Sequence, residues 1–165
     1  MRVSPAEEGG LSLAYRLEGR PEGLCIPSPG RSGPADGLWE HTCFEAFVAA
    51  DDGPAYREFN FSPSGQWAVY AFSDYRQRDH AFQPAAVPEI VLHPAAGGLE
   101  LDVVLPPSLL PPAPPGSVLR LGLTAVVEAA DGGKTYWALA HPGPRPDFHL
   151  RAAFLLPVAV PPPSP

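Results

Sequence analysis

The chain has 165 residues and a formal net charge of −7, with 11 Lys and Arg against 18 Asp and Glu. Nucleic acids and anionic membrane surfaces attract clusters of Lys and Arg, so this balance argues against both as partners. The length suits one domain with a sizeable core, which we expect over residues 1–160, before a frayed Pro-rich tail over residues 161–165.

Proline and glycine are abundant, with 24 and 16 residues, whereas 45% of the chain is hydrophobic. Because the apolar residues recur between the proline clusters, we expect an ordered core, with the prolines in loops and at strand edges. No apolar run approaches the roughly 20 residues that span a bilayer, and the N-terminal MRVSPAEEGG does not resemble a signal peptide. We therefore expect a cytoplasmic protein in which Cys25 and Cys43 are reduced thiols.

The apolar pattern along the chain is that of strands, with no convincing helix. Short runs alternate with Gly- and Pro-containing turns such as SPSG and AAGG, which favour hairpins. This spacing predicts an all-β fold, an antiparallel sandwich or barrel of about nine strands or more. The expected strands are residues 11–17, 41–48, 56–61, 66–72, 89–93, 99–105, 118–128, 135–141 and 150–156.

The segment around residues 41–48 is the most informative. Alternation puts Phe44, Ala46 and Val48 on one face, which we expect in the core. The other face carries Trp39, His41, Cys43, Glu45 and Phe47, if the strand pattern extends back to Trp39. Large aromatics beside an acid and an imidazole are unusual on a solvated face, so this face is a candidate recognition surface.

Tryptophans near polar groups are candidates for ligand contact, because indole rings stack on sugars and other flat apolar faces. Trp67, between apolar neighbours, is expected in the core. For Trp39, a site and a core position both remain open. Trp137 shares strand parity with His141, so these two side chains are expected to face the same way.

The histidines offer a second possibility. His41, His141 and His149, with Glu45 and Asp147 as companions, are the weak candidates for a zinc or iron site. No pair has the spacing of a known metal motif, so histidines bonded to the backbone are the favoured interpretation.

The loop over residues 141–149 contains three prolines that stiffen it. It would hold Arg145 and Asp147 as a binding rim, or as a structural corner in which they pair with each other or with Glu45. The sequence lacks GxSxG, Walker, GxGxxG and CxxC motifs, so nucleophilic, phosphate-binding and dithiol chemistry have no support.

Three segments, LWEHTCFEAFV, YREFNFSPSGQWAVYAF and YWALAHPGPRPDFH, resemble the bacterial DOMON-like domains, which are similar to family-9 carbohydrate-binding modules and to DOMON haem domains. The resemblance covers about residues 37–154 and implies an immunoglobulin-like or jelly-roll sandwich. It implies Trp39 as a sugar platform, Glu45 as the acid that binds hydroxyl groups, Trp137 as the opposite platform and Asn60 as a hydrogen-bonding residue.

The chain departs from these relatives in two places. Residues 40–43 read EHTC where sugar-binding members often carry an Asp, which leaves calcium unsupported. Haem-binding members use a Met ligand, whereas Met1 is the sole Met here. Haem is therefore unsupported as well, with bis-His ligation open only formally, and we expect no cofactor.

The resulting hypothesis is a non-catalytic module that binds a small molecule, most simply a saccharide or cell-wall sugar derivative. The expected site comprises Trp39, Glu45, Asn60, Trp137, His141, Arg145 and Asp147. The alternatives are a metal-dependent enzyme built on the His and Glu residues, a haem-binding domain, and a structural or interaction domain in which these polar residues brace loops. The sequence does not indicate an oligomeric state.

Overall fold

Strands and short 3-10 turns make up the regular structure of the chain. The structure is a computed structural model, and it describes residues 1–6, 9–95 and 97–160. The described residues form twelve strands and no α-helix, which confirms the predicted all-β sandwich. The expected frayed tail at residues 161–165 lies outside the described part. Among the described residues, no helix has the length and apolar character needed to cross a membrane.

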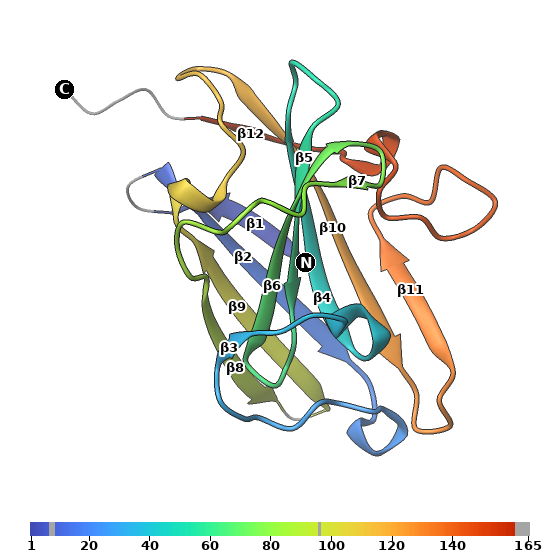
Figure 1. The fold of residues 1–165 in the computed structure, drawn as a ribbon. Coiled ribbons are helices and arrows are strands. Elements are labelled where there is room, and N and C mark those ends of the chain that lie inside the picture. The colour runs from blue at the N-terminus through green and yellow to red at the C-terminus, as the bar shows by residue number, and fades with distance from the viewer. Residues whose placement is uncertain (7–8, 96, 161–165) are drawn as a thin grey trace.

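The strands form two sheets that face each other (Figure 1). The smaller sheet has the order β1 (Arg2–Pro5), β2 (Leu11–Glu18), β9 (Gly98–Leu105) and β8 (Glu89–Ala95). The larger sheet has the order β11 (Lys134–Ala138), β10 (Val118–Glu128), β4 (Cys43–Ala50), β5 (Tyr56–Phe61), β6 (Gln66–Asp74) and β3 (Gly33–Pro34). Two more strands extend it: β12 (Leu156–Ala159) pairs with β10, and β7 (Gln77–Arg78) pairs with β6.

Neighbouring strands are antiparallel, as predicted, with one exception. The short β3 runs parallel to β6, with Gly33 beside Gln66 and Pro34 beside Trp67. A proline at this position costs no ladder hydrogen bond, because β3 is an edge strand.

The main core lies between the two sheets. Alternate residues of β4 (Phe44, Ala46, Val48) pack there with Phe59 and Phe61 of β5, as the alternation predicted. Leucines and valines of β2, β9 and β10 complete this core. Trp67 belongs to it and is only 5% exposed, which confirms the core position expected for that residue.

The outer face of the larger sheet is also partly covered. A second apolar cluster there joins Phe47, Tyr56 and Phe72 of the sheet to Ala153 and Phe154 near the C-terminus. Gly122 of β10 makes this close approach possible, because a Cβ atom at that position would lie 3.1 Å from the Phe154 ring. The C-terminal segment therefore covers part of the outer face of the sheet, which leaves a hollow beside it.

The structure corrects three of the expected boundaries. Trp39 lies in a 3-10 turn, η3 (Leu38–Glu40), and β4 begins only at Cys43. Strand β11 ends at Ala138 rather than at residue 141, because the following loop is rich in prolines that cannot donate to a ladder. The last strand is shifted to Leu156–Ala159, behind a 3-10 turn at Arg151–Ala153 that places Phe154 on the sheet.

Cys25 and Cys43 are both free thiols and form no disulfide with each other, as predicted. Cys43 is buried on β4, whereas Cys25 is exposed.

Candidate functional site

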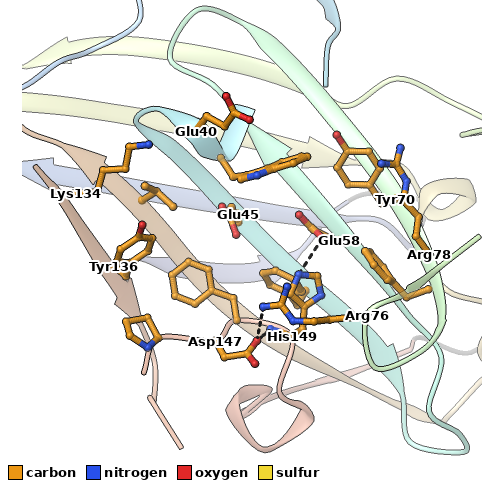
Figure 2. Close-up of a pocket in the computed structure, with 16 residues that line it drawn as sticks. Glu40, Glu45, Glu58, Tyr70, Arg76, Arg78, Lys134, Tyr136, Asp147 and His149 are labelled. Carbon is orange, nitrogen blue, oxygen red and sulfur yellow. Dashed lines mark hydrogen bonds and ion pairs between the residues drawn. The ribbon is translucent and has the colours of Figure 1, made fainter. Parts of the chain in front are cut away.

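A cavity of about 470 Å³ opens on the outer face of the larger sheet (Figure 2). Side chains of β4, β5, β6 and β10 form its floor, and β11 forms one wall. The turn η3, the β6–β7 hairpin and the loop at residues 146–149 form the remaining rim. This volume lies in the range of small-molecule sites, roughly 300–1,000 Å³.

Two glutamates occupy the floor. Strand alternation turns Glu45 and Glu58 to the outer face, and the β4–β5 register places Glu45 opposite Asn60, two residues from Glu58. The two glutamates are 2% and 6% exposed. Thr124 donates a hydrogen bond to Glu45 Oε2 (3.2 Å), and Asn60 donates one to Glu58 Oε1 (2.7 Å).

Burial governs the ionisation of both acids. It raises the pKa of Glu45 well above the usual range, and the neighbouring Glu58 raises it further. Burial also raises the pKa of Glu58, to about 7, although the hydrogen bond from Asn60 opposes the shift. Burial therefore favours the neutral form of Glu45, and at neutral pH Glu58 is close to its midpoint of titration.

His149 lies beside Glu58, with Nε2 at 3.7 Å from Glu58 Oε2. Its Nδ1 lies 2.8 Å from the hydroxyl of Tyr56, which also accepts the backbone N–H of Arg76. In the tautomer in which the Tyr56 hydroxyl donates to Nδ1, the His149 proton is on Nε2, on the side of Glu58. Burial, with the positive charge of Arg76, lowers the pKa of His149 to about 4 and keeps the ring neutral.

Asp147 ties the rim together. It accepts hydrogen bonds from the Tyr75 hydroxyl (2.6 Å), Arg76 Nη2 (3.0 Å) and the His149 backbone N–H (3.0 Å). Burial alone would favour the protonated acid, but these three donors lower the pKa of Asp147. The β6–β7 turn and the loop at residues 146–149 are thereby joined to each other at the cavity rim.

Aromatic rings supply the walls. Trp39 is 39% exposed and meets Tyr70 edge-on, with ring centroids 5.8 Å apart. The Arg78 guanidinium covers Tyr70 at 3.9 Å from the ring centroid. Tyr136 and Phe148 lie on another part of the wall, with ring centroids 6.2 Å apart. The hollow thus combines exposed ring surface with buried hydrogen-bonding acids.

The structure brings together some of the residues singled out from the sequence. Trp39, Glu45 and Asp147 line the cavity. Asn60 lies beneath the floor, fully buried, where it positions Glu58.

Three other predicted residues lie elsewhere. Trp137 pairs with Ala125 on the core-side face of β11 and is 59% exposed, so its neighbour Tyr136 lines the cavity instead. Arg145 is exposed outside the cavity lining, and Asp147 pairs with Arg76 rather than with Arg145. His141 is exposed beyond the end of β11 and stands 6.2 Å from the Phe148 ring, instead of extending the parity of Trp137.

The proposed histidine ligands are not brought together. His41 pairs with Glu128 at 2.8 Å, whereas His149 lies by Tyr56 and Glu58. Within residues 1–6, 9–95 and 97–160, no group of three or more His, Cys, Asp or Glu side chains has an arrangement that could hold a metal ion.

Several cavity residues were not singled out from the sequence. Glu58 has a signal, since it shares a strand face with Asn60 and lies opposite to the core residues Phe59 and Phe61. Arg76 and Arg78 have none, because their position depends on the β6–β7 hairpin folding over the sheet.

Neither a protein-family model nor a curated protein matches the chain. Among solved structures, the fold is similar to that of a candidate carbohydrate-binding protein from Bacteroides uniformis, with a TM-score of 0.64 and 19% sequence identity. The match covers 88% of this chain and 71% of that protein. At this identity the likeness establishes the shared β-sandwich fold.

Proposed function

We propose that the protein is a non-catalytic module that binds a saccharide in the cavity on the outer face of the larger sheet. The observation that carries this proposal is the joint presence of the exposed Trp39 ring and the buried Glu45 carboxyl in one open hollow. An indole offers a flat apolar surface to a sugar ring, and carboxyl groups bind hydroxyls in fixed directions.

The roles follow from the positions of the side chains. Trp39 stacks against the sugar ring, while Glu45 and Glu58 bind hydroxyl groups on the floor. In the protonated form that burial favours, Glu45 has one proton to donate, so it can serve an acceptor oxygen as well as a hydroxyl. The likeness to the Bacteroides uniformis protein supports this class of ligand at the level of the fold.

The structural alternative, in which Glu45 braces the fold, predicts that Trp39 and Glu45 are buried and that an arginine holds Glu45. Glu45 is buried, whereas Trp39 is 39% exposed. The hydrogen-bonding partner of Glu45 is instead the Thr124 hydroxyl, and its carboxyl lines an open cavity. This arrangement favours a binding role.

Trp137→Phe provides a matched control for Trp39→Phe in a saccharide titration followed by tryptophan fluorescence. Both indoles are exposed, but only Trp39 lines the cavity. We expect sugar-induced emission changes and binding to persist in Trp137→Phe and to weaken roughly tenfold in Trp39→Phe. Equal affinities for wild type and both variants, or no response to any saccharide, would contradict the proposal.

A further inference from the structure

The two acids on the cavity floor have no cationic partner in the described part of the chain. Among the described residues, no Lys, Arg or His nitrogen lies within 4.0 Å of the Glu45 carboxyl, and Glu58 has only His149 Nε2, at 3.7 Å. Neutral His149 does not compensate a carboxylate. The deepest polar groups of the cavity are therefore two carboxyls without a direct ion pair to Lys or Arg; the more distant Arg76 and Arg78 favour the charged form of Glu58, but burial outweighs them.

The cationic side chains around the cavity are mostly engaged elsewhere. Arg76 donates to Asp147 at 3.0 Å. Arg78 lies over the Tyr70 ring and 3.8 Å from Asp36. Lys134 projects from β11, on the side of the cavity away from Arg78 (Figure 2). The floor carboxyls thus have no direct cationic partner, and a positive group on the ligand would stabilise their ionised form.

The same space is bounded by rings that attract a cation. Trp39, Tyr136 and Phe148 line the cavity together with Glu45 and Glu58. The faces of aromatic rings carry negative potential and stabilise an ammonium group within about 6 Å. Ring faces and buried acids favour the same charge on the ligand, and they are independent features of the site.

We propose, building on the saccharide-binding function above, that the ligand is an amino sugar whose ammonium group lies against Glu45 and Glu58. Its three N–H donors meet two carboxyl groups, and its ring lies against the indole of Trp39. Each carboxyl that is protonated in the free protein loses its proton to solvent when the ammonium group binds to it, because the ammonium then stabilises the carboxylate. Binding therefore releases protons, and no covalent bond changes.

Calorimetric titration separates this proposal from binding of any sugar. The probes are glucosamine, N-acetylglucosamine, glucose and glucuronate, with 2-aminoethanol as an amine that lacks a sugar ring. We expect glucosamine to bind roughly tenfold or more tightly than N-acetylglucosamine, as charge-assisted hydrogen bonds imply. Runs in two buffers of different ionisation enthalpy should show proton release with glucosamine alone among the sugars.

Isosteric variants test the acids. Glu45→Gln and Glu58→Gln should abolish the preference for glucosamine, and both should fold, because the free protein already holds these groups largely neutral at mildly acidic pH. Glu100→Gln makes the same change on the smaller sheet, where Glu100 lies 3.5 Å from Arg16, and should leave the preference intact. A thermal melt of each variant establishes that it is folded.

The outcomes distinguish this inference from the function on which it rests. Equal binding of glucose, N-acetylglucosamine and glucosamine would overturn the amine and leave saccharide binding standing. Tightest binding of glucuronate would also overturn it, and would assign the ligand charge to Arg78 and Lys134. Binding of 2-aminoethanol as strong as that of glucosamine would support the ammonium contact and contradict saccharide binding. No binding of any probe would contradict both.

Discussion

Glu58 and His149 are neighbours whose pKa values are shifted in opposite directions by the same burial. The pKa of Glu58 rises from 4.5 to about 7, whereas that of His149 falls from 6.5 to about 4. Glu58 stabilises the fold fully below pH 4.5, and this stabilisation is lost as the pH rises to about 7. His149 stabilises it above pH 6.5, and this is lost as the pH falls to about 4. The two effects offset each other in the wild type.

Removing the histidine should expose the effect of the acid. In His149→Gln, the free energy of unfolding relative to wild type should decrease by about 3 kcal/mol as the pH rises from 4 to 6.5. Urea unfolding at several pH values measures this difference. A difference that does not vary with pH would mean that His149 titrates normally in the folded protein.

Removing the acid should have the opposite effect. In Glu58→Gln, stability relative to wild type should increase by about 3 kcal/mol between pH 4.5 and 7. The same urea series measures it. A slope of the same sign as in His149→Gln would contradict the assigned shifts.

The sequence predicted the orientation of individual floor residues better than it predicted their partners. Alternation in β4 turned Glu45 away from the core, and period two is a local property of any strand. Trp39 lines the cavity although it lies in η3, so extending strand parity back to it was the wrong reason for that position. Arg76 reaches the cavity through tertiary contacts with Asp147, which local patterns do not encode.

Short connecting elements, among them the turn η3, form the rim of the cavity. The turn η3 begins after Gly37, whose φ of +72° lies in the left-handed region. A side chain is disfavoured there by about 1–2 kcal/mol. The position of the Trp39 ring therefore depends on a glycine at residue 37.

Gly37→Ala should lower stability by about 1 kcal/mol and weaken saccharide binding by shifting Trp39. Gly53→Ala is the matched control, since an added Cβ there meets nothing within 4 Å. Thermal melts and fluorescence titration of both variants provide the comparison. Loss of binding in Gly53→Ala to the same extent would show that the effect is not specific to η3.

The loop at residues 146–149 depends on Asp147. Asp147→Asn removes the negative charge and one of the two carboxylate oxygens that accept from Tyr75 and Arg76, so we expect a loss of about 1–2 kcal/mol and faster amide exchange in this loop. Asp52→Asn, on the exposed turn after β4, is the control. Unchanged exchange at Phe148 and His149 would show that the loop is held by apolar packing alone.

The hairpins were the elements best predicted from sequence. The β5–β6 and β8–β9 pairs have strong alternation with Gly-containing turns between them, and both form. Strands β1, β3 and β7 were not expected, since they are short and each pairs at one edge only. Their pairing follows from where the sheets place them rather than from their own residues.

In the molecule as a whole, the larger sheet contributes to both the core and the candidate site. The inner face of the larger sheet forms the main core with the smaller sheet, and its outer face carries the cavity. The sequence predicted the two-faced β4 strand but not that the C-terminal segment covers part of its outer face. That coverage brings residues 146–149 to the site over a separation of about 100 residues along the chain from β4.

The expectation of one domain leads to a stability prediction. Leu123 is fully buried between the sheets, and Leu123→Ala should lower the free energy of unfolding by about 2–5 kcal/mol. Fluorescence of the buried Trp67 and far-UV circular dichroism should report the same single transition. Separate transitions by the two probes would contradict a single cooperative unit.

The most direct test of the account is to map ligand contacts by amide chemical shifts during a saccharide titration of the labelled protein. The account predicts that shifts concentrate in β4, β5, η3 and residues 146–149, around Glu45 and Glu58. Shifts confined to the smaller sheet, or the absence of any shift at millimolar sugar, would contradict the claim that the outer face of the larger sheet is the binding site.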